Sequence, residues 1–303
     1  MSTLVAQKAV TVPWIRSQKG QSKITMLTAY DFPMATLLDD AGVDALLVGD
    51  SLGTVIYGEP NTLSVTMEDM IRHTRAVARG AKRALVIADM PFMSYQVSVE
   101  QAVANAGRFL KEASAQAVKL EGGAEMAETI RAITRAGIPV CAHIGLTPQT
   151  LHAMGNYRMH GKSEQERRYL LESAREVERA GAFAVVLECV EESLAREITA
   201  AIEIPTIGIG ASPHCDGQVL VSYDLLGLTA GRVPKFVTQT AQLRDQVIAG
   251  ARAYIDRTRE VSVSATQAPH GAVGAPSVSA TQAPNGAVAA PSNDEGKGHA
   301  PSH

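Results

Sequence analysis

The stretch Leu46-Leu47-Val48-Gly49-Asp50-Ser51-Leu52-Gly53 is an apolar run that ends abruptly in a carboxylate and a hydroxyl group between two glycines. A run of this kind, bounded by turn residues, is typical of a parallel strand that helices bury on both faces. Asp50 lies at its C-terminal end, where α/β sheets and barrels bind their ligands. An Asx turn or a helix N-cap explains Asp50 equally well on this stretch alone. The ends of the other strands decide between these interpretations.

The same pattern recurs along the chain, because further apolar runs end at Asp89, Glu121, His143 and Glu188. Clear strands are expected over 24–31, 46–50, 84–89, 117–121, 138–145, 183–189 and 204–210. Helical spacing occupies 32–41, 66–78, 98–114, 124–136, 163–181 and 192–202. An alternation this regular favours right-handed parallel units.

An eighth strand within 218–228 and a closing helix over 238–257 complete the prediction of a (β/α)8 TIM barrel. An open doubly wound sheet is the alternative. Its glycine-rich nucleotide fingerprint is missing, since Gly208-Ile209-Gly210 continues to Pro213 where the third glycine should be.

The chain ends differ in composition from the barrel. Residues 1–22 form an N-terminal segment in which Pro13 could open a short helix that caps one end of the domain. Residues 23–258 form the predicted catalytic barrel. Residues 259–303 form a low-complexity tail, in which Ser262–Pro276 is nearly repeated by Ser277–Pro291. This tail is expected to be disordered, because its composition buries little apolar surface.

Composition restricts the partners of the protein. A net charge of −3 and an aromatic content of 4% argue against nucleic acid and against an anionic membrane. No apolar segment approaches the ~20 residues of a membrane helix. The three cysteines lack metal-type spacing, which suits reduced thiols in the cytoplasm. We therefore expect a cytoplasmic protein that binds small molecules.

The strand ends predict a cluster of charged side chains. Residues two apart on a strand share a face, so Lys119 and Glu121 should point into the barrel. An ion pair that merely fills the barrel is an equally weighted alternative. Carboxylates converging on one mouth repel each other unless a cation lies among them, and oxygen ligands favour Mg²⁺. His143 is expected as a hydrogen-bonding neighbour, and Cys189 as a packing residue of the helix layer.

Seven motifs in order resemble the signature set of the ketopantoate hydroxymethyltransferase (3-methyl-2-oxobutanoate hydroxymethyltransferase) family, over about residues 13–257. They are Thr28-Ala29-Tyr30-Asp31, Val48-Gly49-Asp50-Ser51-Leu52-Gly53, Ala88-Asp89-Met90-Pro91-Phe92-Met93, Lys119-Leu120-Glu121-Gly122-Gly123, His143-Ile144-Gly145-Leu146-Thr147-Pro148-Gln149, Leu187-Glu188-Cys189-Val190 and Ile207-Gly208-Ile209-Gly210-Ala211. The departures are Ser64, where proline is expected, and the repetitive tail.

The resemblance implies a Mg²⁺-dependent TIM barrel of pantothenate and coenzyme A biosynthesis that assembles into a large homo-oligomer, a decamer. It implies transfer of a hydroxymethyl group from 5,10-methylenetetrahydrofolate to 3-methyl-2-oxobutanoate through a Mg-stabilised enolate, which forms 2-dehydropantoate (ketopantoate). A polarised 2-oxo acid loses its C3 proton more readily, so this chemistry agrees with the residues at the strand ends.

Site residues follow position by position from the resemblance. The matches to the metal ligands are Asp50, Asp89 and Glu121, with His143 near them. The matches to the substrate contacts are Asp50, Ser51, Asp89 and Lys119. Glu188 matches the proton acceptor.

Two other functions compete with this one. The first is another Mg²⁺-dependent barrel that works through a 2-oxo-acid enolate, of the isocitrate lyase and phosphoenolpyruvate mutase type. Such enzymes tend to carry a catalytic cysteine on a mobile loop, and only Cys215 loosely fits. The second is a non-catalytic scaffold, which loss of site carboxylates would favour, but none is lost.

Overall fold

The computed structural model describes residues 8–266, and the side chains of residues 8–260. Eight parallel strands close into a barrel in chain order, with β8 paired to β1. The strands are β1 Ile24–Thr28, β2 Ala45–Val48, β3 Leu85–Asp89, β4 Ala117–Glu121, β5 Val140–Gly145, β6 Ala184–Glu188, β7 Thr206–Ile209 and β8 Gly217–Leu220. The predicted TIM barrel is therefore confirmed, and the open sheet is excluded.

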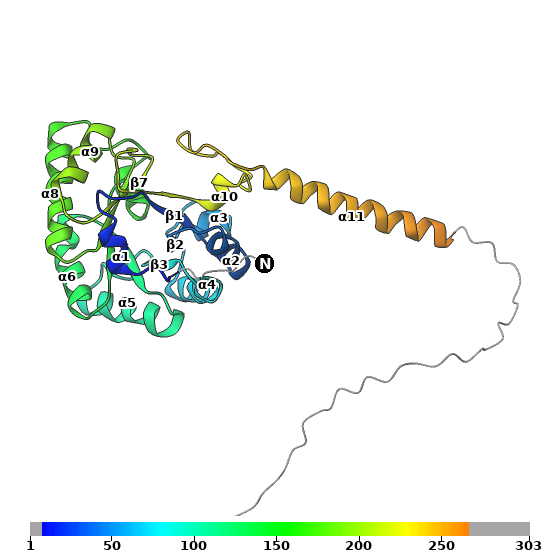
Figure 1. Ribbon diagram of the computed structural model, residues 1–303, viewed down its shortest axis with the longest axis horizontal. Coiled ribbons are helices and arrows are strands. Elements are labelled where there is room, and N and C mark those ends of the chain that lie inside the picture. Colours follow the sequence, from blue (N-terminus) through cyan, green and yellow to red (C-terminus); the bar gives the residue numbers. More distant parts are fainter. Residues whose placement is uncertain (1–7, 267–303) are drawn as a thin grey trace, which may run out of the picture. The chain divides into compact units, whose positions relative to one another are not determined.

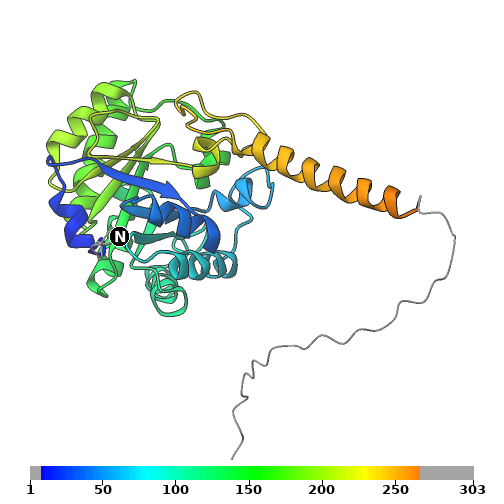
Figure 2. The ribbon, with the colours of Figure 1, turned by 45° about the vertical axis from the view of Figure 1, so that its right-hand side comes forward.

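Helices surround the strands (Figures 1 and 2). The helices are α1 Val12–Ser17, α2 Phe32–Asp40, α3 Leu52–Val55, α4 Met67–Gly80, α5 Val99–Ala113, α6 Ala127–Arg135, α7 Leu151–Met154, α8 Glu164–Arg179, α9 Glu192–Ala201, α10 Ser222–Leu225 and α11 Leu243–Thr266, with 3-10 turns η1 Ala124–Met126 and η2 Pro148–Thr150. Side chains at the N-caps begin the long helices: Thr66 and Asp69 form a capping box on α4, and Ser163 caps α8. In residues 8–266, no helix combines the length and apolar character needed to cross a membrane.

Strand residues alternate between two apolar cores. Val118 and Leu120 of β4 belong to the core shared with the helices, whereas Ala117 belongs to the core inside the barrel. Lys119 and Glu121 lie on the same side of the strand as Ala117, as predicted from the period of two. The inner core therefore ends in charged side chains at the C-terminal mouth.

Residues 8–22 of the N-terminal segment pack against the opposite end of the barrel. Thr11 caps α1, and proline lies in its first turn, as expected. Ile15 is buried in the inner core together with Ile24 and Phe183, which lie at or beside the N-terminal ends of their strands. The mouth is thus the only end of the inner core that carries the predicted site residues.

The end of the chain differs from prediction in its boundaries. β8 stops at Leu220 because the Ser222 N–H donates to Thr28 Oγ1 at 3.0 Å and the chain turns into α10. α11 begins at Leu243 rather than near 238, since the preceding residues bond back to α10, with Thr240 N donating to Leu225 O at 2.9 Å. It continues past 257 to Thr266, because no glycine or proline interrupts the sequence before Pro269.

The chain divides into two units, residues 1–250 and 251–303. The first contains the barrel. The described part of the second, 251–266, is helical. Residues 259–266 of the tail predicted to be disordered are helical instead, and from residue 267 onward the tail lies outside the described residues. The predicted domain boundaries at 22 and 258 stay a prediction.

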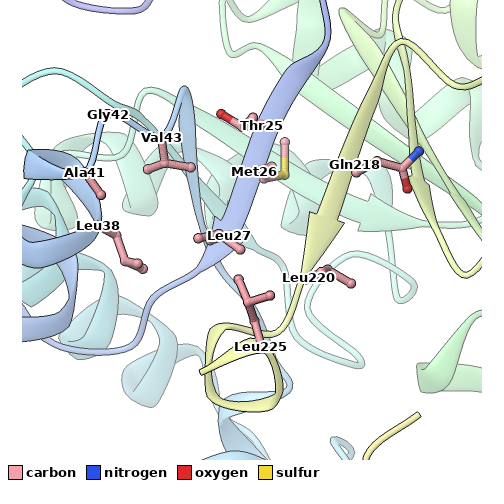
Figure 3. Close-up of a pocket in the computed structure, with 10 residues that line it drawn as sticks. All are labelled: Thr25, Met26, Leu27, Leu38, Ala41, Gly42, Val43, Gln218, Leu220 and Leu225. Atoms are coloured by element: carbon pink, nitrogen blue, oxygen red, sulfur yellow. The ribbon is translucent and has the colours of Figure 1, made fainter. Parts of the chain in front are cut away.

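A cavity of about 410 Å³ lies against β1 and β8 and is distinct from the mouth. In Figure 3, side chains of α2 and its following loop lie on one side of β1, and those of β8 and α10 lie on the other. The lining is apolar apart from Thr25 and Gln218, and it contains no titratable side chain. Acid–base or metal chemistry is therefore not expected in this cavity.

Asp216→Asn is expected to destabilise the barrel by about 2 kcal/mol, the usual scale for hydrogen bonds to a charged group. The Asp216 carboxylate is buried and accepts from Lys19 Nζ at 2.9 Å, Gly20 N at 3.0 Å and Thr206 N at 2.9 Å. Burial alone would raise its pKa, but the donors, Thr206 first and then Lys19, lower it below the ordinary 3.8.

A lowered folded-state pKa stabilises the protein above the unfolded value, and this contribution is lost as pH falls through the folded value. Urea unfolding at pH 7 and at pH 2 to 3 measures the effect. The difference between parent and variant should shrink at the lower pH, while Asp40→Asn, at an exposed position, should change little at either. Equal losses in both variants would contradict this assignment.

Candidate active site

The predicted strand-end residues come together at the C-terminal mouth of the barrel. Register pairs Asp89 of β3 with Lys119 of β4, and Glu121 of β4 with His143 of β5. Glu188 ends β6, and Asp50 follows β2 by two residues. Parallel pairing therefore converts positions far apart in sequence into neighbours on one rim.

Asp50 and Asp89 form a buried carboxylate pair. The Asp50 N–H donates to Asp89 Oδ2 at 3.1 Å, and both residues are at most 5% exposed. Gly49 leaves room for the Ser51 hydroxyl group, because a Cβ there would lie 2.6 Å from Ser51 Oγ. Burial, and then the charge of Asp89, raise the pKa of Asp50 to about 6. The pair therefore carries negative charge at an energetic cost that a nearby cation would reduce.

Lys119 supplies one such cation. Its Nζ lies 2.9 Å from Asp89 Oδ1, a contact that lacks hydrogen-bond geometry, and the side chain is buried. Burial alone would lower its pKa, but the carboxylates of Asp89, Glu121 and Asp50 raise it above the ordinary value. Lys119 is therefore held as a positive charge inside the mouth.

His143 lies between two carboxylates. Its Nδ1 is 3.6 Å from Glu121 Oε1, and its Nε2 is 3.3 Å from Glu188 Oε2, yet neither nitrogen makes a well-formed hydrogen bond. Burial, and then Lys119, lower the pKa of the imidazole, which favours its neutral form. A neutral ring carries one N–H, so it can donate to only one of the two carboxylates. Burial raises the pKa of Glu121 as well.

Sequence reasoning missed three residues that support this cluster. Gln149 Nε2 donates to Asp50 Oδ2 at 2.9 Å, and the Tyr95 hydroxyl bonds to Gln149 Oε1 at 2.7 Å. The Tyr30 hydroxyl lies 2.9 Å from Ser51 Oγ. Tyr30 and Gln149 lie in the quoted motifs. All three residues lie in loops or 3-10 turns, where the sequence has no helix or strand periodicity that would predict which way a side chain points.

The cysteines show no reactive arrangement. Cys141, Cys189 and Cys215 are all free thiols, and Cys141 and Cys215 are buried. Cys189 is half-buried, and burial, and then the Glu188 charge, raise its pKa to about 11. A thiol held protonated is a poor nucleophile. This agrees with the expectation that Cys189 is not a nucleophile, whereas its packing in the helix layer stays a prediction.

The side chains at the mouth supply few direct ligands for a metal ion. Among residues 8–266, no group of three or more His, Cys, Asp or Glu side chains is arranged to hold a metal ion. Glu121 Oε2 accepts from the Gln149 N–H at 3.0 Å. Mg²⁺ nevertheless often takes only one or two protein carboxylates and completes its shell with water and substrate. The adjacent carboxylates of Asp50 and Asp89, with Asp89 Oδ1 buried and lacking a hydrogen bond, fit that requirement.

A closed barrel with buried carboxylates, a lysine and an imidazole at its C-terminal mouth defines the class of (β/α)8-barrel enzymes that act on small molecules. Residues 9–264 match the model of the ketopantoate hydroxymethyltransferase family, and the chain belongs to that family. The 3-methyl-2-oxobutanoate hydroxymethyltransferase of Syntrophus aciditrophicus is 54% identical over 86% of this chain and 96% of its own. That of Pelobacter propionicus is 55% identical over 84% and 94%.

Solved structures share the fold at low identity. Phosphoenolpyruvate phosphomutase from Streptomyces platensis superposes with a TM-score of 0.56 at 13% identity, over 86% of this chain and 92% of its own. A phosphonopyruvate hydrolase solved with oxalate and Mg²⁺ gives 0.54 at 14% identity, over 84% and 88%. Enzymes of the competing mutase type thus share the barrel fold with this chain, but the family that the chain matches is that of the hydroxymethyltransferases.

Proposed function

We propose that this protein transfers a hydroxymethyl group from 5,10-methylenetetrahydrofolate to 3-methyl-2-oxobutanoate and so forms 2-dehydropantoate for pantothenate and coenzyme A biosynthesis. Family membership supports ketopantoate formation, because relatives at 54–55% identity are named 3-methyl-2-oxobutanoate hydroxymethyltransferase. The observation that carries the mechanism is the buried Asp50–Asp89–Lys119 cluster at the mouth, which suits an anionic 2-oxo acid together with a cation.

Asp50 and Asp89 would hold Mg²⁺, with Glu121 as a third carboxylate near the ion. Mg²⁺ supplies Lewis acidity: it withdraws electrons from a 2-oxo acid and stabilises the enolate that proton loss creates. The related fold of phosphonopyruvate hydrolase, whose structure contains Mg²⁺ and oxalate, supports this choice of ion. Buried carboxylates without a cation would repel one another, which also favours it.

Lys119, Ser51 and the aspartates would orient the substrate. The fixed charge of Lys119 offsets the substrate carboxylate. If the buried Tyr30 hydroxyl donates to Ser51 Oγ, the Ser51 hydroxyl hydrogen is free to donate to a substrate oxygen. Both groups would help to hold the 2-oxo acid in one orientation.

Glu188 would remove the C3 proton. It is the most exposed of the clustered carboxylates, with 19% of its side chain accessible, so substrate can reach it. His143 contacts it from the barrel interior and can orient it through a single N–H. The carbon that loses its proton would form the new C–C bond to the methylene carbon. Both bonds from that carbon to the folate nitrogens break, one water molecule supplies the hydroxyl oxygen, and tetrahydrofolate leaves after its two nitrogens take up the C3 proton and a proton of the water. On family resemblance we place this reaction in the cytoplasm, in a large homo-oligomer, a decamer.

The test is an assay of ketopantoate formation by the purified full chain. Product should form with 3-methyl-2-oxobutanoate, Mg²⁺ and 5,10-methylenetetrahydrofolate, and removal of any one component should stop it. Undiminished turnover after exhaustive chelation would contradict the metal assignment. Turnover without the folate would contradict the assigned one-carbon donor.

A further inference from the structure

Gln149 is a buried residue that forms hydrogen bonds to three separate parts of the mouth. It lies on η2 and is 3% exposed. Its Nε2 donates to Asp50 Oδ2 at 2.9 Å and to Met90 O at 3.0 Å. Its backbone N–H donates to Glu121 Oε2 at 3.0 Å. Gln149 therefore contacts two of the carboxylates assigned to the ion, those of Asp50 and Glu121. It also contacts the backbone just after β3, through the carbonyl group of Met90.

Tyr95 determines which end of the Gln149 amide faces Asp50. The Tyr95 oxygen accepts from the Glu121 N–H at 3.1 Å, and its single hydroxyl hydrogen has Gln149 Oε1 at 2.7 Å as its closer acceptor, against Glu121 O at 3.2 Å. Gln96 Nε2 is a second donor to Gln149 Oε1, at 3.2 Å. A flipped amide would place its oxygen against Asp50 Oδ2, two acceptors with no hydrogen between them. The network therefore permits one orientation.

We propose that Gln149 is a positioning residue that fixes the rotation of the Asp50 carboxylate toward the divalent ion and the 2-oxo acid, and that Tyr95 fixes Gln149 in turn. A carboxylate held at one oxygen by a rigid buried donor cannot rotate, so the direction of its other oxygen is set before the ion arrives. This inference rests on the proposed function, because it assigns the ion to Asp50.

Three variants of the full-length protein test it. Gln149→Met keeps the length of the side chain and removes its donors, and Tyr95→Phe removes only a hydroxyl group. Gln116→Met is the matched control, since Gln116 Oε1 accepts from Val86 N at 2.7 Å near the opposite end of the barrel. Calorimetric titration of the metal-free protein with Mg²⁺ gives Kd, and steady-state assays give kcat and KM for 3-methyl-2-oxobutanoate.

Gln149→Met should weaken Mg²⁺ binding by about 10- to 100-fold, the usual cost of losing a partner of a metal ligand. Tyr95→Phe should also weaken Mg²⁺ binding, but by less. If Gln149→Met fails to fold, the Kd of Tyr95→Phe still tests the proposal. Gln116→Met should leave Kd within about twofold, because it touches no site residue.

Parent-like Kd and kcat/KM in both Gln149→Met and Tyr95→Phe would overturn the inference. An equal loss in Gln116→Met would also overturn it, since the effect would then come from general loss of stability. A parent protein that binds no Mg²⁺ would instead refute the proposed metal site, and parent-like kcat/KM in Gln149→Met would then overturn the positioning role separately.

Discussion

Glu188→Gln is expected to slow exchange of the C3 hydrogen of 3-methyl-2-oxobutanoate into D₂O by on the order of 10²- to 10⁴-fold, the usual cost of losing a general base. The substitution keeps the shape of the side chain and removes its basicity. Nuclear magnetic resonance in D₂O with Mg²⁺ present follows the exchange directly. No folate is needed, so the measurement isolates proton removal from the transfer step.

Glu191→Gln is the matched control, because Glu191 lies three residues away and caps α9 through Leu194 N rather than facing the mouth. It should exchange at the parent rate. If Glu188→Gln also exchanges at the parent rate while it binds Mg²⁺ normally, then Glu188 is not the base. His143, 3.3 Å from Glu188 Oε2, would become the better candidate.

Asp50→Asn and Asp89→Asn should each abolish measurable activity at ordinary Mg²⁺ concentrations, because each removes an anionic ligand from a site for a hard cation. Titration with Mg²⁺ measures the loss of affinity. The two variants should differ in stability. Asp89→Asn leaves the buried Lys119 without its nearest carboxylate, 2.9 Å away, and should destabilise the fold.

Asp50→Asn should instead stabilise the metal-free protein, by about 3 kcal/mol at pH 8 on the scale of about 1.4 kcal/mol per pKa unit. Burial, and then Asp89, raise the pKa of Asp50 from 3.8 to about 6 in the folded state. A raised carboxyl pKa makes folding less favourable as pH rises through this window. The difference in the free energy of unfolding between Asp50→Asn and the parent should therefore vanish below about pH 4 and reach its full size above about pH 6.

Thermal unfolding with a chelator present, from pH 4 to pH 8, measures this difference. Normal Mg²⁺ titration in both variants would refute the metal site. An Asp50→Asn variant that is less stable than the parent at pH 8 would show that Asp50 is not under electrostatic strain.

The barrel and the strand-end residues could be predicted from sequence, because both follow from local patterns. Apolar runs that alternate with helical spans specify the topology, and the period of two along β4 places Lys119 and Glu121 inside. Strand ends in a parallel barrel must meet at one rim. For that reason Asp89, Glu121, His143 and Glu188 could be placed together without knowledge of any contact.

The supporting contacts could not be predicted in this way. Gln149 and Asp50 are 99 residues apart, and their hydrogen bond depends on where η2 folds over the mouth. The occupation of Glu121 by a backbone N–H of Gln149 has no side-chain signal at all. The start of α11 was missed for a similar reason, because the residues around it form hydrogen bonds to Leu225 and to the two residues that follow α10.

The burial of Lys119 among carboxylates also restricts the covalent chemistry open to this barrel. An amine must lose its proton before it can attack a keto carbon and form an imine. Without a metal ion, Asp89, Glu121 and Asp50 together hold the Lys119 pKa above its ordinary value, which disfavours the free amine near neutral pH. In the proposed site, a 2-oxo acid beside this lysine would therefore meet a positive charge rather than a Schiff-base nucleophile.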